Sequence, residues 1–194
     1  MSLSVLPPPY YVFFTLVEPG LTVGGVVYAV FQPVAYLDSL VPPSTPLLQT
    51  GSHVIDKVFK PHATQNAIMA TRQLGSCFFL LALLASVCFK SICHQLDPVK
   101  IKHDSQGLKD VVIQHQKFET IVANYLWCLA VADLTHIGFT LYDLGSTYAF
   151  DPSTWTTLVW GNVGITSVLF LVRSLWFAGI GRTSYIVNSK KKRQ

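Results

Sequence analysis

The sequence predicts an all-α polytopic membrane protein, a four-helix bundle that forms one domain over residues 1–194. Hydrophobic residues make up 51% of the 194-residue chain and charged residues only 12%, a balance too apolar for an ordinary soluble domain. Long apolar stretches lie at about 10–31, 66–90, 118–148 and 156–179. Each is long enough for the roughly 20 residues that a helix needs to cross a hydrocarbon core.

The first apolar stretch, at about 10–31, is predicted to remain in the protein as a membrane helix. Residues 1–10 carry no basic side chain, and the stretch contains Glu18 and Pro19, which argues against a cleavable signal peptide. At 100° per residue, the residues of one polar stripe fall within an arc of about 80° of the helix. They are Tyr11, Thr15, Glu18, Thr22 and Gly25. Because a charge in hydrocarbon is costly, we expect Glu18 to face the inside of the bundle.

The connection at about 32–65 is predicted to be a luminal loop. It is rich in proline, with Pro42, Pro43, Pro46 and Pro61. A loop of this length either covers the mouth of the bundle as a lid or lies on the surface, and both interpretations stay open. The second apolar stretch follows and carries Arg72 and Ser76 one helical turn apart.

The third and fourth stretches carry the clearest polar stripes. On the third, an arc of about 120° holds Glu119, Asp133, His136, Thr140 and Asp143. On the fourth, an arc of about 40° holds Asn162, Thr166 and Arg173. Ionisable residues in membrane helices face a bundle interior or a cavity, so these stripes mark candidate functional sites.

The basic residues predict that both termini lie in the cytosol. They gather around the connection between the second and third helices and in the tail at 182–194, whereas the first connection has only Lys57 and Lys60. The positive-inside rule places the basic side in the cytosol. Near the end, Lys191 and Lys192 resemble a dilysine retrieval signal and favour the endoplasmic-reticulum membrane. A cluster that contacts lipid headgroups fits the same residues.

No cofactor, metal ion or nucleic acid is expected. Free thiols are predicted because the cysteines lie within helices or at the cytosolic side; they are Cys77, Cys88, Cys93 and Cys128. None has zinc-like spacing with histidines, and the chain shows no nucleotide or haem motif. The net charge of +4 is concentrated at the cytosolic face, as membrane orientation alone requires.

Depth along the helices groups the charged residues into two sites. At about 1.5 Å per residue, Glu18 lies roughly 12 Å from the cytosolic surface and Arg173 approaches the same leaflet, so we expect them to pair. Asp133 and His136 lie roughly 22 to 27 Å from that surface. A second cluster is therefore predicted in the luminal half: Asp133, His136, Arg72 and Asn162. Each site is either a structural pair that fixes helix register or a group that transfers protons.

These residues favour a cofactor-independent isomerase or cyclase that acts by proton transfer on a lipophilic substrate of isoprenoid, sterol or polyketide-like type. The candidate catalytic residues are Asp133, His136 and Glu18, and the candidate substrate-binding residues are Trp160, Asn162, Arg173, Arg72 and Asp143. The alternative is a lipid-binding, sterol-binding or accessory membrane protein, which needs the same cavity but not the acids. Transport fits less well because four helices rarely build an alternating-access pathway.

Several short motifs resemble those of a known family. They are Leu6-Pro7-Pro8, Glu18-Pro19, Phe31-Gln32-Pro33 with Tyr36, Ala132-Asp133-Leu134-Thr135-His136, and Trp160-Gly161-Asn162-Val163-Gly164 followed by Arg173 and Gly179. Over nearly the whole chain they resemble a family of small fungal integral membrane proteins defined only as a domain of unknown function. This resemblance implies a four-helix membrane bundle and supplies no activity. A looser likeness, of architecture alone, is to EXPERA-type sterol isomerase and sterol-binding domains.

Overall fold

The computed structural model describes residues 5–40, 65–96 and 108–182, and these residues are almost entirely helical. Four helical spans are long and apolar enough to cross a membrane: Pro8–Phe31, Gln65–His94, Val112–Ala149 and Thr157–Phe177. They match the four predicted stretches, so the all-helical class is confirmed and the protein has the spans of a multi-pass membrane protein. Most of the predicted basic tail and most of the proline-rich connection lie outside the described residues.

The first span consists of α1 (Pro8–Val12), the π-helical turn η1 (Phe13–Val17) and α2 (Glu18–Phe31). The amide of Glu18 donates to the carbonyl of Phe13, five residues earlier, and Pro19 has no amide hydrogen to continue the ordinary ladder. The wider turn rotates the residues that follow it around the helix axis. Glu18 comes directly after this turn and is buried.

The second span consists of α6 (Gln65–Leu83), the π-helical turn η2 (Leu84–Phe89) and α7 (Lys90–Leu96). α6 packs along α2, and the two form an antiparallel hairpin. Gly75 lies at their contact, where an added Cβ would come within 2.6 Å of the Val30 side chain. The lack of a side chain at Gly75 therefore lets the two helices approach closely.

The connection after α2 begins with a helix rather than a loop. α3 (Pro33–Asp38) follows a single non-helical residue, Gln32. The Tyr28 hydroxyl donates to the Ala35 carbonyl at 3.0 Å, and the ring of Tyr36 packs edge to face on Tyr28. The predicted loop at 32–65 is thus corrected at its start: Pro33 begins α3 at a first-turn position, where a missing amide hydrogen costs nothing.

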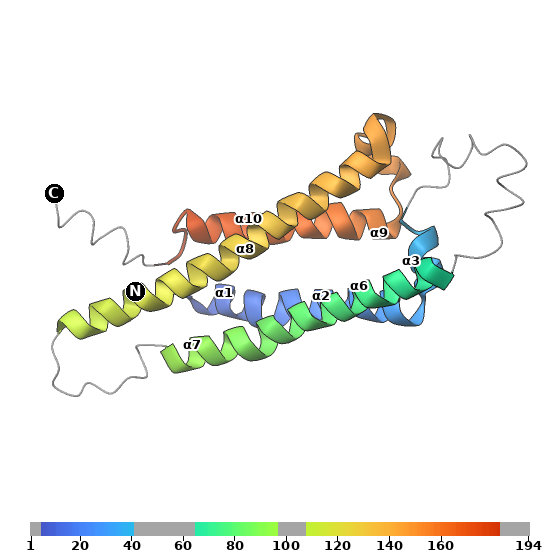
Figure 1. Ribbon diagram of the computed structural model, residues 1–194. Helices are drawn as coiled ribbons and strands as arrows, with labels where there is room; N and C mark the ends of the chain where they lie inside the picture. Colours follow the sequence, from blue (N-terminus) through green and yellow to red (C-terminus); the bar gives the residue numbers. More distant parts are fainter. Residues whose placement is uncertain (1–4, 41–64, 97–107, 183–194) are drawn as a thin grey trace, which may run out of the picture.

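The third span belongs to α8 (Leu108–Ala149), a 42-residue helix that is interrupted at Gly145, where φ is +70°. α8 begins well before residue 118, the start expected from the sequence. The fourth span follows a short η3 turn (Pro152–Thr154) and consists of α9 (Thr157–Val159), the π-helical turn η4 (Trp160–Ile165) and α10 (Thr166–Phe177). α8 crosses α10 diagonally, and these two helices form the second hairpin (Figure 1).

The two hairpins share their largest core at the end of the bundle where α1 begins and α10 ends, which we call the terminal end. Buried residues from all four spans meet there: Val5, Leu6, Phe14, Phe89, Cys93, Phe118, Val122, Leu126 and Trp176. At the opposite end, the hairpin end, a smaller core involves only the third and fourth spans: Leu144, Ala149, Val159 and Val163. The four helices therefore converge mainly at the terminal end.

Replacing Gly75 with valine is expected to destabilise the first hairpin. The new side chain would meet Val30, and overpacking of this kind costs about 1 to 3 kcal/mol in the free energy of unfolding. The midpoint of thermal unfolding in detergent should fall. Gly20→Val is the matched control, because no atom lies within 4 Å of a Cβ added at Gly20. Equal losses in the two variants would contradict the proposed close contact.

Candidate functional site

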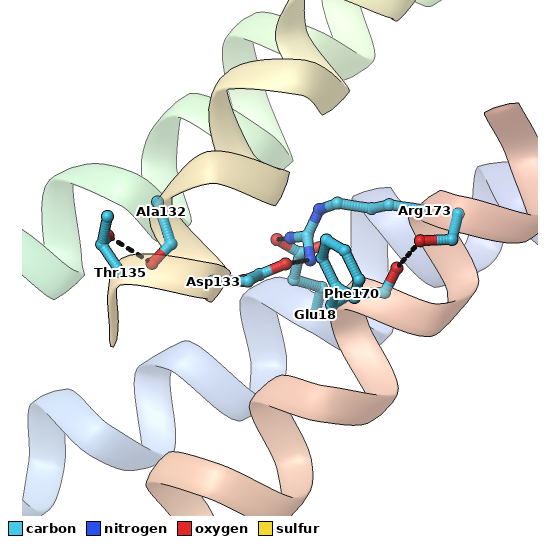
Figure 2. Close-up of polar contacts among 7 residues, drawn as sticks. Glu18, Ala132, Asp133, Thr135, Phe170 and Arg173 are labelled. Atoms are coloured by element: carbon cyan, nitrogen blue, oxygen red, sulfur yellow. Dashed lines mark hydrogen bonds and ion pairs between the residues drawn. The ribbon is translucent and has the colours of Figure 1, made fainter. Parts of the chain in front are cut away.

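Three charged side chains from three spans meet inside the bundle, and we call them the charge triad: Glu18, Asp133 and Arg173. The guanidinium of Arg173 donates from Nη2 to Glu18 Oε1 and from Nη1 to Asp133 Oδ2 (Figure 2). The exposed fractions of the three residues are 7%, 8% and 1% in chain order. The predicted pairing of Glu18 with Arg173 is confirmed, and Asp133 joins it.

The triad lies beside the shared core at the terminal end. Glu18 follows the buried Phe14 by one turn of the first span, and Arg173 precedes the buried Trp176 on α10. Asp133 belongs to α8, so the guanidinium of Arg173 joins the second hairpin to the first. Breaking one member of such a buried group leaves an uncompensated charge, and the triad therefore fixes the register of three spans.

The triad has an excess of one negative charge when all three groups are ionised, because two carboxylates face one guanidinium. A net charge in a low-dielectric bundle is costly. A single proton held by either carboxyl group makes the triad neutral. The triad can therefore bind or release one proton while the Arg173 guanidinium stays paired with a carboxylate.

Two polar atoms of the triad find no hydrogen-bond partner among the described residues. They are Oε2 of Glu18 and Nε of Arg173, and both are buried. The side chains of Glu18 and Asp133 each remain 10% exposed, so the triad is not completely sealed. A buried donor and a buried acceptor without partners in one ion-paired group are unusual, since such atoms are nearly always satisfied.

The predicted luminal cluster of Asp133 with His136, Arg72 and Asn162 is wrong in its composition. Asp133 bonds Arg173, and the Arg72 side chain is exposed on α6. His136 and Asn162 are half-buried, and no hydrogen bond in the described part of the chain joins either side chain to Asp133. The depth estimate assumed upright helices, whereas α8 crosses the bundle diagonally and rises less per residue.

The remaining predicted substrate-binding residues lie toward the hairpin end. Trp160 is 49% exposed and packs edge to face on Trp155, with ring centroids 5.0 Å apart. Asp143 is exposed on α8. Thirteen residues separate Trp160 from Arg173, which corresponds to about 20 Å of helix. The structure therefore does not bring Trp160 or Asp143 to the charge triad.

A second buried ion pair, between Arg182 and Glu119, was missed at the sequence level. The two groups are 2.7 Å apart, and the Arg182 guanidinium lies 3.8 Å from the centroid of the Trp176 ring. Gly179 and Gly181 have positive φ values and turn the chain back after α10, which brings Arg182 over that ring. Arg182 was predicted to belong to the basic tail, and Gly179 and Gly181 were the only sequence signal for this turn.

Neither a metal site nor a disulfide is seen among the described residues. No group of three histidine, cysteine or acidic side chains there is arranged to hold a metal ion. Cys93 is buried, and the thiols of Cys77, Cys88 and Cys128 are exposed and unpaired with one another. The described bundle interior thus holds the charge triad, the Arg182–Glu119 pair and a buried histidine, His115.

The fold and the site together define a class: a membrane-type bundle of four helical spans with a buried charge triad. A family model described as a domain of unknown function (DUF7704) matches residues 3–96 and 108–183, and the chain belongs to this family. The matched segments contain all three triad residues. No curated protein and no solved structure matches the chain. The expected family, defined only as a domain of unknown function, is confirmed; its fungal origin and the EXPERA likeness stay predictions.

Removing only the guanidinium of the triad should destabilise the protein strongly. Arg173→Met leaves two buried carboxyl groups facing each other, and loss of one partner from a buried ion pair costs about 3 to 5 kcal/mol in the free energy of unfolding. The triple variant Glu18→Gln, Asp133→Asn, Arg173→Met carries no charge at these positions and should regain most of this loss. Thermal unfolding in detergent measures both, and a triple variant no more stable than Arg173→Met would contradict the ion-pair account.

Proposed function

We propose that this protein is a cofactor-independent membrane enzyme that isomerises or cyclises a lipophilic substrate by proton transfer. The observation that carries the proposal is the charge triad, in which two acids share one guanidinium inside an apolar bundle. Isoprenoid, sterol and polyketide-like substrates fit this chemistry because they dissolve in the bilayer and contain carbon–carbon double bonds. General acid catalysis requires a proton donor that is positioned and partly shielded from water.

Glu18 is the proposed proton donor, because its Oε2 atom has no partner within the described residues. In an isomerisation, the O–H bond of the carboxyl group breaks, a C–H bond forms on one alkene carbon, and the neighbouring carbon becomes a cation. The triad then holds one excess negative charge, which stabilises that cation. Loss of a proton from an adjacent carbon to the same carboxylate restores the acid and shifts the double bond.

Asp133 and Arg173 have supporting roles in this proposal. Arg173 binds Glu18 and stabilises its carboxylate after the proton has left, and Asp133 holds the guanidinium in place. His136, Trp160 and Asn162 are proposed to contact the apolar remainder of the substrate toward the hairpin end. His136, predicted as a catalytic residue, is proposed as a substrate contact because Asp133 bonds Arg173.

A second candidate function is lipid or sterol binding without chemistry, in the manner of an accessory membrane protein. It is favoured by the fact that both Nη atoms of Arg173 already bond acids of the same chain. Such a triad is stable without a ligand and can serve only to fix helix register. The architectural likeness to EXPERA-type domains is compatible with either function, since that class contains both isomerases and binding proteins.

Incorporation of solvent deuterium tests the enzyme proposal. The purified full chain in nanodiscs is incubated in D₂O with a neutral-lipid extract, and the lipids are analysed by high-resolution mass spectrometry. The wild-type protein should introduce deuterium into at least one lipid or convert it to an isomer. Glu18→Gln should slow this reaction by about 100-fold or more, because an amide cannot donate the proton.

Glu119→Gln is the matched control for this experiment. It also replaces a buried acid that bonds an arginine, but Glu119 pairs with Arg182 rather than with the triad. The control should retain the wild-type rate. A folded Glu18→Gln variant that reacts at the wild-type rate would overturn the assignment, and an unaltered co-purifying lipid with no deuterium uptake would favour the binding function.

We also propose that the protein resides in the endoplasmic-reticulum membrane with both termini in the cytosol, on the support of the basic residues. An Asn-X-Thr acceptor introduced into residues 41–64 should then become glycosylated, and one introduced into residues 97–107 should not. A shift in gel mobility that is reversed by a glycosidase measures both. Glycosylation only at 97–107 would invert the orientation.

A further inference from the structure

The two hairpins are joined more extensively at the terminal end than at the hairpin end. At the terminal end, all four spans contribute to the shared core, and the charge triad joins the first span to the third and fourth. At the hairpin end, the buried cluster contains residues of α8, α9 and η4 only. Among the described residues, α2 packs along α6 and α8 packs on α10, whereas no comparable packing joins α2 or α6 to α8 or α10.

A hydrogen bond between Thr156 and Ser39 connects the two hairpins at the hairpin end, and we call it the latch. The hydroxyl group of Thr156 donates to the carbonyl of Ser39 at 2.5 Å. Ser39 follows α3 and Thr156 precedes α9, two elements that lie at the same end of the bundle (Figure 1). A single neutral hydrogen bond contributes far less to stability than a shared core together with a buried ion-paired group. The latch is therefore weak compared with the terminal-end connection.

Both sides of the latch are held within their own hairpins. On one side, the Tyr28 hydroxyl on α2 bonds the Ala35 carbonyl at 3.0 Å and the Ser39 hydroxyl at 2.9 Å. On the other side, the Thr156 hydroxyl accepts from the amide of Val159 at 3.2 Å and caps α9. Val159 is itself part of the buried hairpin-end cluster. Breaking the latch can therefore leave each hairpin intact.

We propose that the latch closes a lateral gate between the two hairpins. When the bond from Thr156 to Ser39 breaks, the hairpins separate at the hairpin end and pivot about the terminal end. The charge triad lies at this pivot, because Arg173 bonds Glu18 across the two hairpins. A lipophilic molecule that enters from the bilayer between the separated hairpins thus approaches the triad. The gate goes beyond the proposed function, since its opening requires no reaction.

Two substitutions of Thr156 separate the latch from the helix cap. Thr156→Asp keeps an oxygen that accepts from the Val159 amide, because aspartate is a good N-cap residue. Its ionised carboxylate cannot donate to the Ser39 carbonyl, so the latch is lost. Thr156→Asn is the matched control, since its side-chain oxygen caps α9 and its amide nitrogen can still donate. A difference between the two variants therefore reports the latch.

Distances between spin labels test the gate in the full chain in nanodiscs at mildly alkaline pH. Genetically encoded spin-label residues replace Phe31 and Phe150, which are 76% and 84% exposed, to report the hairpin end. A second pair, at Val12 and Ile113, reports the terminal end. Thr156→Asp should raise the ratio of long to short distances in the first pair about fivefold relative to Thr156→Asn, as expected for the loss of one neutral hydrogen bond. The second pair should not change.

Equal distance distributions in the two variants would overturn the gate. A shift in both label pairs would also overturn it, because the whole bundle would then loosen without a pivot. Latch-dependent opening without deuterium uptake from D₂O would support the gate and refute the enzyme proposal. Deuterium uptake by a lipid without latch-dependent opening would support the enzyme and refute the gate, so the two failures are distinguishable.

Discussion

The bonds from Arg173 to Glu18 and Asp133 are the constraint on which the rest of this structure depends. A single guanidinium cannot be left alone in an apolar bundle, and neither can either acid, so the three side chains must meet. Because they come from the first, third and fourth spans, their meeting sets how far each helix slides past the others. The shared core at the terminal end lies beside that alignment and contains the aromatic residues Phe14, Phe89, Phe118 and Trp176.

The local backbone conformation helps to position Glu18 for its contact with Arg173. The π-helical turn η1 and the proline after Glu18 change the direction in which the first span presents its polar stripe, and Glu18 is buried directly after the turn. Beyond α10, the turn at Gly179 and Gly181 places Arg182 against Trp176, whose indole nitrogen donates to the Val5 carbonyl at 3.2 Å. The chain ends that the structure describes are thus joined to the same end of the bundle that holds the triad.

The chemical interest of the triad lies in its unequal charge count. A one-to-one ion pair would be neutral and closed, whereas two acids around one base carry an extra negative charge unless a proton is bound. In addition, one oxygen of Glu18 and one nitrogen of Arg173 are buried without a hydrogen-bond partner among the described residues. A purely structural triad would need neither feature, and this difference is why the proton-transfer function is preferred over register alone.

The sequence by itself determined the four spans, because length and apolar composition are local properties, and it determined that Glu18 and Arg173 face inward and pair. Only the tertiary structure decided the partner of Asp133 and the burial of Glu119 with Arg182. Counting residues converts to depth only for upright helices with known ends, whereas α8 starts at Leu108 and crosses α10 at an angle. Partners between helices depend on tilt and on how far a long arginine reaches, and neither is encoded in the periodicity of one helix.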